Sequence, residues 1–207
     1  APVTICNKLK ELGYKGRFVT FGSVFEMGET HEERFFTEED VLTSTCPAPN
    51  DYTVSKRMLS SFVSSYKHDF THWHFYIPTI YGAGEIPKRL IPYVINAIRN
   101  GEELHFTAGD QTRQYVHVSE VPRMLAQAFD KNLPSGLYNI QGKETVTVKE
   151  IVTEIHHAMG KEVPDGCFGS VQRADVGMKY LALDGKKLHD ATGFEASIKI
   201  TDVIDTY

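Results

Sequence analysis

Arg17-Phe-Val-Thr-Phe-Gly-Ser23 is a short apolar run that ends in a glycine and a serine, and His74-Phe-Tyr-Ile-Pro-Thr-Ile-Tyr81 is a second run of the same kind. Such runs, rich in β-branched and aromatic residues, are typical of buried strands. Residues 52–67 lie between them and carry apolar side chains at helical spacing. The order strand, helix, strand predicts a parallel α/β sheet, in which ligands bind at the C-terminal ends of the strands.

The helix expected over residues 52–67 begins with Tyr52-Thr-Val-Ser-Lys56. Positions i and i+4 lie on one face of a helix, so the phenol and the ammonium project together. A fixed positive charge beside a phenol favours the phenolate, which lets a tyrosine act as a general acid or base near neutral pH. Ser23, at the end of the first strand, supplies a hydroxyl for the reacting oxygen. Ser23, Tyr52 and Lys56 are therefore the candidate catalytic residues, although a Tyr-Lys pair at this spacing also arises by chance.

The segments that flank this unit are predicted from the same periodicities and from helix caps. Residues 28–51 are acidic and rich in Thr, Pro and Asn, which predicts a long loop over the site rather than a core element. Further helices are expected over residues 2–12, 90–99, 119–131 and 148–159. Further strands are expected over residues 103–106, 115–118 and 137–140.

Composition excludes several classes of protein. The 207 residues include 22 Lys and Arg against 27 Asp and Glu, a net charge of −5, so there is no basic field for nucleic acid. No apolar run approaches the roughly 18 residues that a membrane span requires, and no signal peptide is visible. Cys6, Cys46 and Cys167 are odd in number and far apart, which argues against a disulfide framework and favours a reducing cytoplasm.

Six stretches in a fixed order resemble the extended short-chain dehydrogenase/reductase family, which includes nucleotide-sugar epimerases, dehydratases and ketoreductases. They are residues 18–23 with 28–29, 50–56, 77–85, 109–118, 136–140, and 148–150 with 183–184. The resemblance implies an α/β fold, with the C-terminal part of a Rossmann-type parallel sheet and a smaller α+β substrate-binding domain. Residues 1–82 would be the remnant of the Rossmann-type domain and residues 83–207 mainly the nucleotide-sugar domain. Whether segments such as 115–141 return to the first sheet stays open.

The resemblance further implies an NAD(P)-dependent epimerase or 4-ketoreductase. Tyr52 would exchange a proton with a sugar hydroxyl or keto oxygen while the nicotinamide takes or gives a hydride. Lys56 would bind the nicotinamide ribose and stabilise the ionised Tyr52, and Ser23 would hydrogen-bond the same sugar oxygen. Pro78 and Thr79 belong to the stretch over the nicotinamide, so they join Tyr52 and Lys56 as candidate cofactor-binding residues for NAD or NADP.

Three arginines are implied as substrate-binding residues. Arg113 stands in the stretch whose arginine grips the nucleotide diphosphate in this family, and Arg173 joins it by position. Arg89, at the start of the helix expected over residues 90–99, is a weaker candidate. A planar guanidinium suits phosphate oxygens. A solvated surface charge is the alternative for each of the three.

The chain departs from the family pattern at three places. The glycine-rich turn that lays a pyrophosphate on a helix N-terminus is missing, and about a third of the enzyme is expected to precede Ala1. The 4,6-dehydratases carry Asp-Glu directly after the catalytic Thr, whereas Val24 and Phe25 stand here, which disfavours dehydration. Met27 replaces the usual Tyr, and Tyr76 stands where Arg is frequent.

Several alternatives remain open. A cofactor-free module that binds a nucleotide sugar or a partner is one, and a 4,6-dehydratase is another. A steroid- or flavonoid-type reductase is a third, and it is disfavoured because the Arg113 segment would be idle there.

A metal site and a dimer are also weighed on the sequence. His68, His72 and His74 surround Trp73, but only Asp69 is available as a further ligand, so no metal is expected. Family members often pair through the Tyr-Lys helix, which predicts a homodimer. The side chains of Met58, Leu59, Phe62 and Val63 would form that face or else pack in the core of their own subunit.

Overall fold

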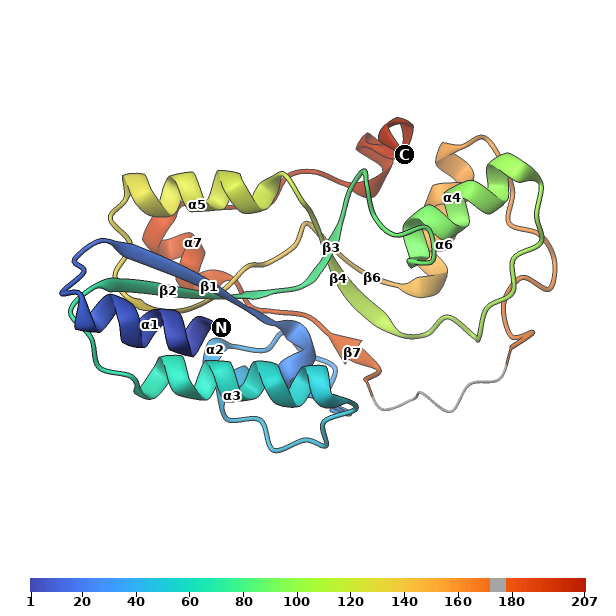
Figure 1. The fold of residues 1–207 in the computed structure, drawn as a ribbon. Coiled ribbons are helices and arrows are strands. Elements are labelled where there is room, and N and C mark those ends of the chain that lie inside the picture. Colours follow the sequence, from blue (N-terminus) through green and yellow to red (C-terminus); the bar gives the residue numbers. More distant parts are fainter. Residues whose placement is uncertain (172–177) are drawn as a thin grey trace.

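The structure is a computed structural model that describes residues 1–171 and 178–207. Its helices and strands are interspersed along the chain (Figure 1). The α-helices are α1 (Pro2–Glu11), α2 (Glu38–Leu42), α3 (Asp51–Ser65), α4 (Leu90–Asn100), α5 (Glu120–Asp130), α6 (Val148–Ala158) and α7 (Lys186–Thr192), and the 3-10 helices are η1 (Val24–Met27), η2 (Ile200–Asp202) and η3 (Ile204–Thr206). The strands are β1 (Arg17–Ser23), β2 (Thr71–Ile77), β3 (Thr79–Tyr81), β4 (Thr112–His117), β5 (Gly136–Asn139), β6 (Glu144–Thr147) and β7 (Tyr180–Leu181).

The first sheet has the parallel order β1-β2-β5, which confirms the predicted α/β class. Helices α1 and α3 lie on one side of it, and α5 and α7 lie on the other (Figure 1). Ser23 pairs with Ile77, so β1 and β2 end together at one edge. The chain returns to this sheet at β5, after it has passed through the second sheet.

Side chains of β2 alternate between the two faces of the first sheet, as a strand requires. Trp73 and Phe75 are fully buried and pack with Met124 of α5 and Leu188 of α7. His72 and His74 are equally buried but point to the other face, where they meet Thr20 of β1 and α3.

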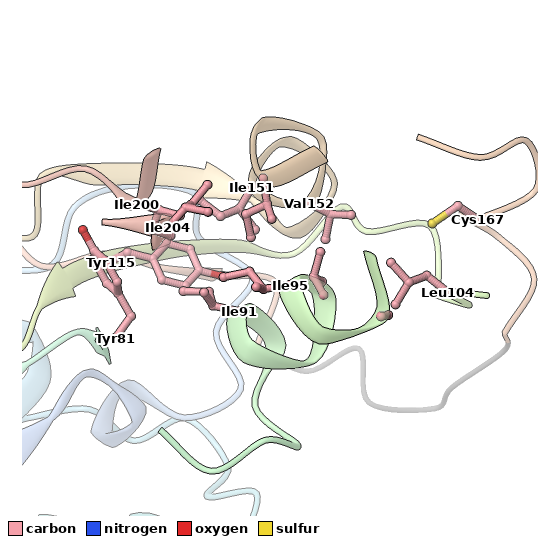
Figure 2. Packing of buried hydrophobic residues seen from close by; sticks show 13 residues of the cluster. Tyr81, Ile91, Ile95, Leu104, Tyr115, Ile151, Val152, Cys167, Ile200 and Ile204 are labelled. Carbon is pink, nitrogen blue, oxygen red and sulfur yellow. The ribbon is translucent and has the colours of Figure 1, made fainter. Parts of the chain in front are cut away.

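The second sheet has the order β3-β4-β6, with β7 paired to β4. Its core lies between the sheet and helices α4 and α6 (Figure 2). Tyr81 and Tyr115 come from the strands, and Ile95 and Ile151 come from the two helices. This amphipathic packing explains why residues 90–99 and 148–159 were predicted as helices nearly to their observed bounds.

Two predictions about strands were wrong. Residues 74–81 form two strands in different sheets, because Pro78 has no N–H for a ladder and interrupts the run. Residues 103–106 form no strand, and Phe106 makes only an isolated bridge to Phe168.

The prediction for residues 28–51 was also wrong in part. This segment contains α2, which Thr37 and Asp40 cap reciprocally. Phe36 and Val41 are buried in a cluster with Tyr76 and Leu183. The segment therefore contributes to the core.

Candidate active site

Helix α3 presents the predicted Tyr-Lys pair at its start. Asn50 caps the helix, and its side-chain oxygen accepts a hydrogen bond from the Thr53 N–H at 3.0 Å. Tyr52 is about half exposed, at 51%. The Nζ of Lys56 lies 5.7 Å from the centre of the Tyr52 ring. The phenol and the ammonium are thus neighbours, as their spacing predicted.

Lys56 joins the pair to the end of β1. Its Nζ donates to the backbone oxygen of Phe21 at 2.7 Å, two residues before Ser23. Ser23 is buried, caps η1 and accepts a hydrogen bond from the Phe25 N–H at 3.2 Å. The structure therefore places Lys56, with Tyr52 beside it, against the C-terminal part of the parallel strand that ends at Ser23.

The candidate cofactor-binding residues Pro78 and Thr79 follow β2 at the same edge, because Ser23 pairs with Ile77. Pro78 is buried and Thr79 is partly exposed. An ammonium has three donors, of which Lys56 gives one to Phe21, so this side chain suits the hydroxyls of a ribose as well.

Glu26 is a part of this region that sequence reasoning missed. It is fully buried; its Oε1 accepts from the Ser23 N–H at 2.8 Å and its Oε2 from the Ser60 hydroxyl at 2.5 Å. Burial raises the pKa of Glu26, while the bonds from Ser60 and Ser23 and the charges of Lys56 and Arg57 act to lower it. The spacing Ser-x-x-Glu is that of a capping box, and this signal was available in the sequence.

Arg57 was missed as well. Its guanidinium donates to three backbone oxygens, those of Glu26 at 2.7 Å, Met27 at 3.0 Å and Cys46 at 2.8 Å. Arg57 therefore joins α3 to η1 and to the segment 28–51. A single residue following Lys56 carries no sequence pattern that predicts such a contact.

A second candidate region lies at the other sheet. Arg113 of β4 lines a cavity of about 420 Å³ together with Lys88, Tyr93 and Phe106. Its Nη1 donates to the backbone oxygen of Thr112 at 2.8 Å. A cavity with two cations and two aromatic rings has the chemical character required by a base and a diphosphate.

Arg89 occupies the N-cap position of α4. It forms an ion pair with Glu85 at 3.1 Å and donates to the Ile80 oxygen at 3.0 Å. Arg173 lies outside the described residues.

Two of the three histidines weighed on the sequence are hydrogen-bonded within the chain. His72 and His74 share one face of β2, and each ring bonds the Thr20 hydroxyl at 2.8 Å. Among residues 1–171 and 178–207, no three His, Cys, Asp or Glu side chains gather in a way that would hold a metal ion. In the same part of the chain, no helix has both the length and the apolar character to cross a membrane.

Residues 1–140 match the NAD dependent epimerase/dehydratase family. The chain belongs to this family. Two curated relatives are dTDP-glucose 4,6-dehydratases. The one from Escherichia coli is 27% identical over 142 residues, which are 63% of this chain and 37% of the relative. The one from Streptomyces griseus is 26% identical over 127 residues, which are 59% of this chain and 37% of the relative.

Solved structures of low sequence identity share the fold. The dTDP-glucose 4,6-dehydratase from Bacillus anthracis str. Ames, solved in complex with NAD, has a TM-score of 0.82 at 18% identity. The match covers 99% of this chain and 65% of that one. The UDP-N-acetylglucosamine 4-epimerase from Methanobrevibacter ruminantium M1, in complex with UDP-N-acetylmuramic acid, has a TM-score of 0.78 at 16% identity, with the same shares covered. These matches confirm the predicted Rossmann-type fold, and this chain spans less than two thirds of each relative.

Proposed function

We propose that this chain carries the acid–base site of an NAD(P)-dependent nucleotide-sugar epimerase or 4-ketoreductase. The observation that carries the proposal is the position of Lys56, which contacts both the ring of Tyr52 and the backbone of β1 two residues before Ser23. Membership of the family supports the reaction class. NAD, when bound, supplies the group that accepts and returns a hydride.

The three side chains divide the proton chemistry between them. Tyr52 takes the proton of a sugar hydroxyl as the carbon is oxidised and returns it on reduction. The charge of Lys56 stabilises the phenolate form of Tyr52 during this exchange. Ser23 donates a hydrogen bond to the same sugar oxygen, which orients it toward the phenol. Pro78 and Thr79 border the cofactor at the neighbouring strand end.

We propose that the nucleotide part of the substrate binds in the cavity lined by Arg113 and Lys88. The guanidinium and the ammonium would neutralise the diphosphate, and the rings of Tyr93 and Phe106 would pack against the base. Arg89 and Arg173 are proposed as additional phosphate contacts. The solved epimerase holds a UDP-sugar, which supports this class of ligand.

A 4,6-dehydratase is the second candidate, because the curated relatives bear that name. Dehydration needs an acid that protonates the leaving hydroxyl. Positions 24 and 25, where dehydratases carry Asp-Glu, hold Val and Phe here, and the nearby Glu26 has both carboxylate oxygens engaged by Ser23 and Ser60. These residues favour epimerisation or keto reduction.

Replacing Tyr52 with Phe in the complete gene product tests the assignment. Turnover of the nucleotide sugar is expected to fall by ~100-fold or more, because general acid–base catalysis is lost. Affinity for the nucleotide sugar, measured by calorimetry, should change little. Tyr66→Phe, at the far end of the same helix, is the matched control. Undiminished turnover in Tyr52→Phe would exclude this site.

We also propose a homodimer that forms through α1 and α3 in the cytoplasm. Val54 and Met58 lie one turn apart on α3 and are exposed, as are Ile5 and Leu12 on α1. Val63, by contrast, is buried within the subunit. The three cysteines are free thiols, which suits a reducing compartment. Met58→Glu should lower the sedimenting mass to that of a monomer.

A further inference from the structure

A row of buried polar side chains lies between the first sheet and helices α1 and α3. Each member is 5% exposed or less. In spatial order the members are Cys6, His72, Thr20, His74, Ser60 and Glu26. Buried polar groups are costly unless each is hydrogen-bonded, so a row of six requires a physical account.

The first half of the row joins α1 to the sheet. The Cys6 Sγ lies 4.0 Å from His72 Nδ1. The Thr20 hydroxyl lies 2.8 Å from both His72 Nε2 and His74 Nδ1. Thr20 is thus the shared hydrogen-bond partner of the two imidazoles. It has one proton to donate, so at least one of the two rings must donate to it.

The second half joins the sheet to α3 and to the catalytic strand end. His74 Nε2 lies 3.0 Å from the Ser60 hydroxyl, and Ser60 lies 2.5 Å from Glu26 Oε2. Glu26 Oε1 accepts from the Ser23 N–H at 2.8 Å. Glu26 is therefore the only link in the described part of the row between Ser23 and the helix that carries Tyr52.

Neutral imidazoles make the row directional. Burial lowers the pKa of His72 to about 4 and that of His74 to about 3, so each ring holds one proton at neutral pH. An ionised Glu26 obliges Ser60 to donate to it, and Ser60 must then accept from His74 Nε2–H. His74 Nδ1 consequently accepts from Thr20, and Thr20 accepts from His72 Nε2–H.

We propose that Glu26 is a positioning residue: its side chain spans Ser23 and Ser60 and so holds Ser23 at a fixed distance from α3, and its ionised carboxylate sets both His72 and His74 in the Nε2–H tautomer. The catalytic part of this proposal rests on the proposed function of Ser23 and Tyr52; the tautomers do not. The positive charges of Lys56 and Arg57 favour the ionised form of the Glu26 carboxylate.

The side chains of the row pack tightly around Gly22. A Cβ at this position would lie 2.6 Å from Glu26 Oε1, 2.7 Å from His74 Nε2 and 2.6 Å from Tyr76 Cδ1. No L side chain fits there without displacing these buried groups. Gly22 lies between the Phe21 oxygen that binds Lys56 and the Ser23 amide, and its lack of a side chain leaves space for the Glu26 carboxylate.

The tautomers are measured by long-range proton–nitrogen correlation NMR on isotope-labelled histidine. In the wild-type protein His72 and His74 should both show the Nε2–H form. In Glu26→Gln the glutamine oxygen must face the Ser23 N–H, so its NH₂ group donates to Ser60. The Ser60 proton is then available to donate to His74 Nε2, and this donation reverses the row. His74 and His72 should then both change to Nδ1–H. Glu39→Gln, an exposed carboxylate on α2, should leave both tautomers unchanged.

Two spectra would overturn the directional row. One is a wild-type protein with His74 in the Nδ1–H form, which needs no variant to be observed. The other is a folded Glu26→Gln variant in which His74 keeps the wild-type tautomer.

The turnover rate tests the positioning role by comparing side chains of different length at position 26. Glutamine keeps the length of Glu26 and can still span Ser23 and Ser60, whereas aspartate is one methylene shorter and cannot. We expect kcat to stay within ~3-fold for Glu26→Gln and to fall ~10-fold or more for Glu26→Asp, with KM for the nucleotide sugar unchanged in both. A Glu26→Asp enzyme as active as Glu26→Gln would overturn the positioning role. If the wild-type gene product turns over no nucleotide sugar, the proposed function fails while the spectra still decide on the row.

Discussion

The two faces of β2 are built from the same seven residues but differ in chemistry. Trp73 and Phe75 face α5 and α7 in an apolar cluster, whereas His72 and His74 face α1 and α3 in a hydrogen-bonded row. All four side chains are 1% exposed or less. Burial alone therefore does not distinguish the faces.

The difference teaches where stability and precision come from in this fold. Apolar burial is non-directional and stabilises any arrangement that removes the same area from water. A buried hydrogen-bonded row is directional, since each donor must meet its own acceptor. The apolar face of β2 holds the sheet to α5 and α7. The polar face fixes the position of α3 relative to β1.

The largest loss of stability is expected for a substitution on the apolar face. Trp73→Ala removes a fully buried indole that packs edge-on against Phe129 at 4.9 Å and donates to the Leu133 oxygen at 2.8 Å. The free energy of unfolding should fall by ~3–5 kcal/mol, from lost transfer energy and the cavity left behind. Urea denaturation measures this. A loss below that for the polar-face variants would reverse our ranking of the faces.

A smaller effect is expected at the centre of the polar face. Thr20→Val keeps the shape of the side chain but leaves His72 and His74 without their shared hydroxyl. The free energy of unfolding should fall by ~1–3 kcal/mol, because a buried polar group without a partner keeps its desolvation cost. Thr20→Ser, which retains the hydroxyl, is the matched control and should lose less. Equal losses for the two variants would show that the methyl group matters more than the row.

The smallest expected effect is a dependence of the free energy of unfolding on pH. The folded pKa values of about 4 for His72 and about 3 for His74 lie below the unfolded value of 6.5, so the unfolded chain binds more protons between pH 6.5 and 4. Stability should therefore fall as pH falls through this window, by at most ~1.4 kcal/mol per pH unit for each histidine. The raised pKa of Glu26 opposes the trend in its own range. His74→Gln should flatten the slope in urea titrations at several pH values, and an unchanged slope would contradict a neutral His74.

The sequence predicted helices and strands well where the pattern that defines them lies within a single element. The first strand was placed at residues 17–23, as observed, and α1, α3, α4, α5 and α6 lie within two residues of prediction at each end. Side-chain periodicity and caps such as Thr147 act within one helix or strand, so the sequence contains them directly.

Predictions failed where a segment depends on distant partners. Whether residues 79–81 continue β2 or pair with β4 depends on a strand more than 30 residues later, at Thr112–His117. The short strand β7 exists only because β4 lies beside it. Isolated two- or three-residue segments carry too little periodicity to reveal such pairing.

The sequence by itself determined the α/β class and the Tyr52–Lys56 pair, because hydrophobic period and i,i+4 spacing are fixed along the chain. Only the tertiary structure decided that Glu26, Ser60 and His74 meet beneath Ser23, since they come from three elements and their contacts depend on how a sheet and a helix pack. These side chains come within hydrogen-bonding distance only when the three elements pack together, and that packing is a property of the folded chain.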